Sequence, residues 1–155
     1  MAEQRHTIRL ATYLAKRRVR VLEAATKEEA IQKMLALFRD SPSMADHATF
    51  ADAIWQREEV LPTGLGLGIG VPHARTPAVR HPAAALAVFP SGIPYGSLDK
   101  LPVRLILMIG MPENTRNEYL LYLAKATQLF RRPDFRERLL ACDTDAALWE
   151  AVEKT

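Results

Sequence analysis

The chain has 155 residues, of which 48% are hydrophobic and 25% are charged, and its formal net charge is +3. This length fits one domain with a sizeable core, so we expect a single domain over residues 1–155. The small positive charge does not indicate a nucleic-acid partner, and no apolar run reaches the roughly 18 residues of a membrane span. Cys142 is the only cysteine, which excludes an internal disulfide and favours a cytoplasmic protein without membrane insertion.

The first predicted elements are a short strand and two helices. Residues 18–24 (RVRVLEA) alternate in the manner of a strand. Residues 26–38 (TKEEAIQKMLALF) predict a helix, because Thr26 and Glu29 form a capping box and apolar residues follow at helical spacing. A second helix is expected over 45–58 (ADHATFADAIWQRE), with Asp46 placed to cap it.

Two later apolar runs, 83–89 (AAALAVF) and 103–110 (VRLILMIG), are bounded by proline and glycine, which is typical of buried strands in an α/β sheet. Between them, 89–102 holds three prolines and two glycines, and this composition predicts turns and a loop.

Helices are expected to complete the chain. Residues 117–130 (NEYLLYLAKATQLF) predict a long helix that is apolar on more than one face and therefore well buried. Pro133 can open a helix over 134–141, and Thr144 can cap a last helix over 145–152. The whole order predicts an α/β fold, a three-layer sandwich in which a mixed sheet is flanked by helices on both faces.

The segment 63–76 (TGLGLGIGVPHART) alternates glycine with apolar residues. Its spacing fits neither the G-x-G-x-x-G fingerprint nor a Walker loop, so no bound nucleotide is predicted. If the segment is extended, one face carries Leu65, Leu67, Ile69 and Val71, and the other face is bare backbone open to a close neighbour. Pro72 fixes its own φ and favours an extended residue before it, which places His73 at a stiff strand end.

His73 has two interpretations at this stage. It is either a structural histidine or a phosphoryl acceptor, since a largely neutral imidazole is nucleophilic without a separate base. An acceptor needs anion donors nearby. The candidate donors are the backbone N–H groups of Gly68 and Gly70 and the side chains of Arg57, Thr63 and Arg75. For the three side chains, a helix-end cation, a turn cap and a surface arginine are the competing interpretations.

Other titratable residues give weaker signals. Glu58 and Glu59 are adjacent, so they do not face each other on a helix, and a solvated face is expected. His81 follows His73 by eight residues, but no third ligand has suitable spacing, so no metal site is predicted. Leu65 and Leu67 either join the core or form an apolar rim where a partner docks.

The segment 56–75 (QREEVLPTGLGLGIGVPHAR) resembles the active-site segment of enzyme IIA of the fructose–mannitol type in the bacterial phosphotransferase system, including its nitrogen-related branch. The shared features are an Arg-Glu pair, Thr-Gly, a glycine-rich run and an apolar-Pro-His-Ala-Arg end. The resemblance extends over nearly the whole chain, including 26–38 and 91–114 (SGIPYGSLDKLPVRLILMIGMPEN). Lys100 follows Asp99 where the family has a Leu-Asp-Gly turn.

The resemblance implies an α/β sandwich in which His73 accepts a phosphoryl group from the phosphocarrier HPr or a paralogue. Arg57 and Thr63 would help to hold the site, and no metal or organic cofactor would be needed. Family members usually carry a second histidine at the start of the late helix, where this chain has Tyr119. A tyrosine can hydrogen-bond a phosphate, but with a pKa near 10 it does not change charge near neutrality.

Three outputs remain open from the sequence. Tyr119 favours a regulatory role through protein contacts, as in the nitrogen-related branch. The phosphoryl group could instead pass to an EIIB component of a separate sugar permease. In the third case the chain is a binding module that kept the fold and lost the relay.

Overall fold

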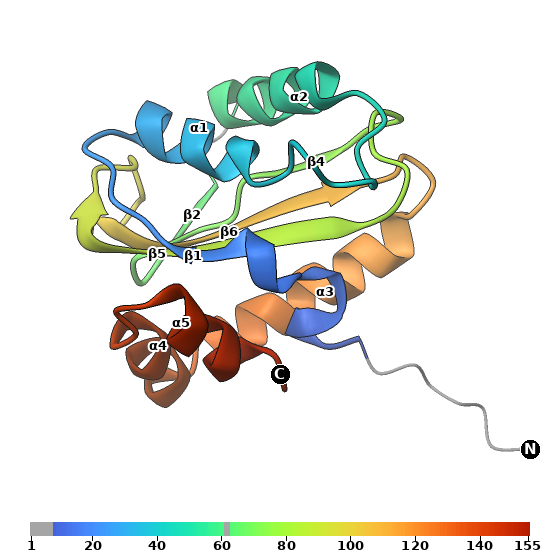
Figure 1. Ribbon diagram of the computed structural model, residues 1–155. Coiled ribbons are helices and arrows are strands. Elements are labelled where there is room, and N and C mark those ends of the chain that lie inside the picture. The colour runs from blue at the N-terminus through green and yellow to red at the C-terminus, as the bar shows by residue number, and fades with distance from the viewer. Residues whose placement is uncertain (1–7, 61–62) are drawn as a thin grey trace, which may run out of the picture.

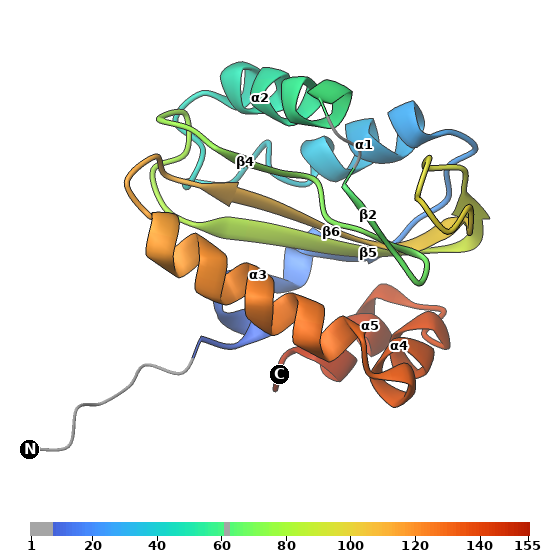
Figure 2. The ribbon, with the colours of Figure 1, turned by 180° about the vertical axis from the view of Figure 1, so that it is seen from behind.

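The computed structural model describes residues 8–60 and 63–155, and it has three layers (Figure 1, Figure 2). Two helices cover one face of the central sheet, α1 (Lys27–Ala36) and α2 (His47–Val60). Three helices cover the other face, α3 (Arg116–Phe130), α4 (Pro133–Leu140) and α5 (Asp145–Val152). Two short 3-10 helices, Leu10–Tyr13 and Lys16–Arg18, precede the first strand. The predicted α/β sandwich is confirmed.

The sheet has six strands and is mixed. The strands are β1 (Val19–Val21), β2 (Gly64–Gly66), β3 (Ile69–Gly70), β4 (His73–Arg75), β5 (Ala83–Ile93) and β6 (Val103–Met111). Their order is β1-β5-β6-β3-β2, and β4 also pairs with β6. The β5–β6 and β2–β3 pairs are antiparallel, whereas β1 is parallel to β5, and β3 and β4 are parallel to β6.

Strands β5 and β6 form the centre of the molecule and are buried from both sides. Along β6, Leu105 and Leu107 belong to the core under α3, α4 and α5, whereas Ile106 and Met108 belong to the core under α1 and α2. This explains why both strands read as continuous apolar runs. Strand β5 also continues to Ile93, into residues expected to form a loop, because its pairing with β6 resumes there after a register shift.

The helices follow their local sequence signals with one exception. At the start of α1, the Thr26 side chain accepts a hydrogen bond from the Glu29 N–H at 3.1 Å, which is half of the predicted capping box. Helix α3 is not buried on all sides, because Leu120 and Leu121 are 48% and 60% exposed. The expectation of a well-buried helix was wrong for this face. No helix among the described residues is long and apolar enough to span a membrane.

The glycine segment folds as a tight hairpin and not as one extended strand. Strands β2 and β3 are antiparallel, and Gly64 pairs with Gly70. Three consecutive residues at the turn have positive φ, Gly66 (78°), Leu67 (60°) and Gly68 (77°). The alternate glycines permit this reversal, so the predicted common face is broken: Leu65 is exposed, whereas Ile69 and Val71 are buried.

Asp99 fixes the tip of this hairpin. The Leu67 N–H donates to Asp99 Oδ2 at 2.8 Å, and the Leu101 N–H donates to Oδ1 at 3.1 Å. Lys100, between Asp99 and Leu101, has a φ of 60°, a left-handed conformation that glycine adopts without steric cost. The lysine therefore has a backbone conformation that suits a glycine better.

Candidate active site

His73 begins β4, which resumes the pairing with β6 after a short interruption that follows β3. Ile69 pairs with Leu105 and His73 pairs with Ile109, so the register against β6 is the same before and after the interruption. Pro72 has no N–H to donate, but its carbonyl accepts the Ile109 N–H at 3.0 Å. The backbone before His73 is therefore held to β6 although the strand is broken there.

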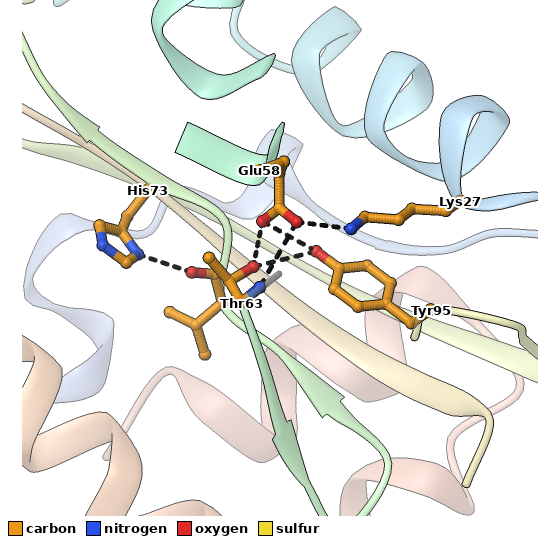
Figure 3. A network of polar contacts seen from close by, with 6 residues as sticks. Lys27, Glu58, Thr63, His73 and Tyr95 are labelled. Carbon is orange, nitrogen blue, oxygen red and sulfur yellow. Dashed lines mark hydrogen bonds and ion pairs between the residues drawn. The ribbon is translucent and has the colours of Figure 1, made fainter. Parts of the chain in front are cut away.

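The imidazole of His73 lies on the α3 side of the sheet. Its ring faces Tyr119 of α3, with ring centroids 5.4 Å apart and planes tilted by 41°. Its Nδ1 is 2.8 Å from the Val71 carbonyl oxygen (Figure 3). Because a carbonyl only accepts, Nδ1 carries the proton, and the neutral ring has its lone pair on Nε2.

The surroundings of His73 favour the neutral ring. Burial lowers the pKa of His73 below its usual 6.5, and the hydrogen bond to the Val71 carbonyl partly opposes this. The Arg57 charge lowers the same pKa further, and the Glu58 carboxylate raises it. At neutral pH the ring is therefore uncharged and nucleophilic at Nε2.

His73 lines a cavity of about 430 Å³ at the edge of the sheet. Its wall is formed by Arg57, Thr63, Gly64, Leu65, Val71, His73, Gly96, Leu98 and Leu123. A histidine, an arginine and a threonine thus share the cavity with leucines, valine and glycine backbone. Leu98 is 99% exposed and Leu65 is 48% exposed, so the outer rim is apolar and open to solvent.

The structure brings several of the predicted site residues together. Arg57 and Thr63 line the cavity with His73, and Tyr119 lies against the imidazole. Burial raises the pKa of Tyr119 to about 12, although the Arg57 and Arg75 charges act in the opposite direction. Tyr119 is therefore a neutral hydrogen-bonding group at physiological pH. Arg75 is exposed on β4, close enough to Tyr119 to act on it electrostatically.

The two predicted glycines lie elsewhere. Gly68 is in the hairpin turn, where its carbonyl accepts the N–H groups of Arg104 and Leu105. Gly70 packs against the Tyr95 ring so closely that a Cβ would lie 3.0 Å from Cζ. Neither is among the residues that line the His73 cavity, which Gly64 and Gly96 line instead. Within residues 8–60 and 63–155 no cluster of three His, Cys, Asp or Glu side chains is arranged to hold a metal ion.

A buried polar cluster next to the cavity was not predicted from the sequence. Glu58 is 5% exposed, so the expectation that it is solvated was wrong, whereas Glu59 is exposed. The physical reason is helical spacing: Phe50, Ile54 and Glu58 are four residues apart and are the buried positions of α2. This spacing was the available signal, but only the tertiary structure shows the Lys27 ammonium that reaches Glu58 Oε2 at 2.7 Å.

Several known proteins are similar to this chain in sequence or in fold. The family model described as "Phosphoenolpyruvate-dependent sugar phosphotransferase system, EIIA 2" matches residues 12–155. The chain is 37% identical over 128 residues to the fructose-specific EIIA component of Haloferax volcanii, which covers 83% of each protein. It is 32% identical over 133 residues, 86% of its length, to the fructose-specific EIIABC component of Bacillus subtilis, and it spans only 21% of that larger protein.

A solved structure shows the same fold. The nitrogen regulatory protein IIA-Ntr from Neisseria meningitidis superposes with a TM-score of 0.83 at 25% identity. The match covers 92% of this chain and 98% of that one. Similarity therefore extends both to sugar-specific proteins and to a nitrogen regulatory protein.

Proposed function

The chain belongs to the EIIA 2 family of the phosphoenolpyruvate-dependent sugar phosphotransferase system, and on this premise we propose that it accepts a phosphoryl group on His73. One observation carries the proposal. The Val71 carbonyl holds the Nδ1 proton of His73, so the Nε2 lone pair of this cavity-lining residue is available to a phosphorus atom. The low pKa of the ring keeps that lone pair free at neutral pH.

The transfer balances without a metal or an organic cofactor. The phosphoryl donor is a phosphohistidine of an HPr-type carrier. Nε2 attacks its phosphorus, the new N–P bond forms as the old one breaks, and the electron pair returns to the donor nitrogen. The positive charge that develops on the His73 ring is stabilised by the Nδ1–H bond to Val71. Arg57 lines the same cavity and supplies positive charge for the phosphoryl oxygens.

The rim of the cavity supports a protein as the donor. Leu65 and Leu98 expose apolar surface beside His73, and exposed apolar patches mark places where proteins associate. The sequence left two placements open for Leu65, the core or an apolar rim, and its exposure places it on the rim. A carrier docked on this rim would bring its phosphohistidine to Nε2.

We propose a regulatory output for the phosphorylated form. Tyr119 supports this output. A neutral tyrosine beside His73 can hydrogen-bond a phosphoryl group, but unlike a histidine it cannot become positively charged near neutral pH as the group leaves. A second candidate output is transfer to an EIIB component, which is supported by 37% identity to a fructose-specific EIIA component. A module that binds partners without accepting phosphate is the remaining alternative.

A reconstituted relay tests the proposal. The protein is incubated with phosphoenolpyruvate, enzyme I and HPr-type carriers, and its intact mass is measured at neutral pH. We expect one acid-labile phosphate on the wild type and on His81→Ala, an exposed histidine that serves as the control, and none on His73→Ala. If the wild type gains no phosphate from any carrier, the chain is a binding module and the proposal fails.

A further inference from the structure

Four side chains from separate segments form a polar cluster beside the His73 cavity (Figure 3). Lys27 comes from α1, Glu58 from α2, Thr63 precedes β2, and Tyr95 follows β5. Glu58 Oε1 accepts the Thr63 hydroxyl and the Tyr95 hydroxyl, the latter at 3.4 Å. Glu58 Oε2 accepts the Thr63 N–H at 3.4 Å and pairs with Lys27 Nζ at 2.7 Å.

The cluster is costly to bury, and its stability alone does not account for it. The side chains of Lys27 and Glu58 are only 18% and 3% exposed, so both charges lose most of their hydration. A buried ion pair is seldom more stable than well-packed apolar residues of the same volume. Buried polar groups with several satisfied bonds do, however, hold their neighbours in one geometry.

Hydrogen bonds lead from this cluster to the imidazole. The Thr63 carbonyl accepts the Val71 N–H at 3.0 Å, and the Val71 carbonyl accepts the His73 Nδ1 proton at 2.8 Å. The Val71 backbone thus links the two residues: its N–H is bonded to Thr63, and its carbonyl is bonded to the His73 ring. The Tyr95 ring also packs against Gly70, so the cluster contacts this segment at a second place.

We propose that Glu58 is a positioning residue for His73. It fixes Thr63, and through Thr63 and Val71 it sets the orientation of the imidazole and keeps the proton on Nδ1. The inference rests on the proposed function of His73 as the acceptor. It also gives Thr63 a role: its single hydroxyl proton is donated to Glu58, so Thr63 acts by holding the backbone and not by donating to the phosphoryl group.

Electrostatics act in the same direction. The Glu58 carboxylate raises the pKa of His73, whereas Arg57 lowers it. Glu58 therefore favours the positive charge that the ring acquires while the N–P bond forms. Arg57 is positively charged, so it favours the negatively charged phosphoryl group to which His73 becomes bonded.

The first test is Glu58→Gln, with Glu59→Gln as the matched control on the exposed side of the same helix. A glutamine offers one acceptor oxygen where four donor contacts need two. We expect phosphorylation to be about 10- to 100-fold slower, with little change in the KM for the carrier, because a small misplacement of a reacting group has effects of this size. Glu59→Gln is expected to match the wild type.

Nitrogen-15 NMR of the His73 ring supplies a readout that does not depend on phosphorylation. The wild type is expected to show a neutral ring protonated at Nδ1, and Glu58→Gln is expected to show a mixture of tautomers. This separates the two proposals: a wild type that is never phosphorylated defeats the proposed function, while the tautomer measurement still tests the role of Glu58. A wild-type tautomer and a wild-type rate in Glu58→Gln would overturn the inference.

Two further variants separate positioning from stability. Lys27→Met with Glu58→Gln removes both buried charges, and we expect its Tm to recover toward the wild type while the phosphorylation rate stays low. Tyr95→Phe removes one hydroxyl and is expected to slow the reaction less than Glu58→Gln. If the double variant recovers the rate together with its stability, the cluster is only structural and the inference is wrong.

Discussion

Two regions beside the His73 cavity reverse the usual placement of side chains. On the outer rim, Leu65 and Leu98 are exposed to solvent. In the polar cluster, Glu58 and Lys27 are largely removed from it. Each arrangement is unfavourable for a protein that only has to fold, because exposed apolar surface promotes association and buried charge loses hydration.

From this difference we infer different roles for the rim and the polar cluster. Leu65 and Leu98 on the rim are exposed and therefore available to a partner. The cluster is held in place, since Glu58 is bonded to groups from three other segments. We therefore expect rim substitutions to change the affinity for the carrier and cluster substitutions to change the rate within the complex.

A charge on the rim is expected to weaken the binding of the carrier. Leu98→Asp should raise the KM for the carrier about tenfold or more, because the aspartate must lose water in an apolar contact. Its kcat and Tm should stay near the wild type, since Leu98 is almost fully exposed. Leu101→Asp is the matched control, because Leu101 is also exposed but does not line the His73 cavity.

Steady-state phosphorylation at varied carrier concentration separates the two parameters. A lower kcat at unchanged KM in Leu98→Asp would show that the rim, like the cluster, acts on the rate and not on the affinity for the carrier. The same result in Leu101→Asp as in Leu98→Asp would show that the response is not specific to the rim.

A smaller effect is expected at Tyr119, which lies against the imidazole and belongs to neither region. Tyr119→His should speed transfer from His73 to an added EIIB domain by a few fold, because histidine can change charge near neutrality and tyrosine, with its pKa raised to about 12, cannot. Tyr119→Phe keeps the ring without the hydroxyl and controls for packing. The decay of phosphoprotein after EIIB is added measures the rate, and an unchanged or lower rate in Tyr119→His would contradict this account.

The smallest effect concerns stability against pH. The pKa of His73 is lowered by burial, so below pH 6.5 the unfolded chain binds a proton that the folded chain does not. This group therefore destabilises the fold as the pH falls from about 6.5 toward its folded pKa, and it has no effect above that range. We expect His73→Gln to lose less stability than the wild type between pH 7.5 and pH 5.

Urea unfolding at the two pH values measures this difference, with His81→Gln as an exposed control. Equal losses in the wild type and in His73→Gln would show that the imidazole is not held in the neutral form.

Local signals in the sequence were sufficient for much of the fold. The Thr26 cap depends on residues that are near it in the chain, so the local sequence predicts it. Strands β5 and β6 are buried from both sides, and this burial appears in the sequence as continuous apolar runs. The acceptor candidate His73 was also found, because Pro72 and the family resemblance mark it. Arg57 and Thr63 were named beside it as candidate site residues, and both line the same cavity as His73.

What the sequence did not show depends on contacts between distant segments. Glu58 looks solvated until Lys27 and Tyr95 are brought to it from α1 and from the end of β5. The glycine alternation suits an extended strand as well as a turn, and Asp99 from a later loop holds the turn.

The most direct measurement is the intact mass of the protein after incubation with phosphoenolpyruvate, enzyme I and an HPr-type carrier. We expect a single acid-labile phosphate on the wild type and on His81→Ala, and none on His73→Ala. A wild type that stays unmodified with every carrier, or a His73→Ala variant that is still phosphorylated, would show that His73 is not a phosphoryl acceptor.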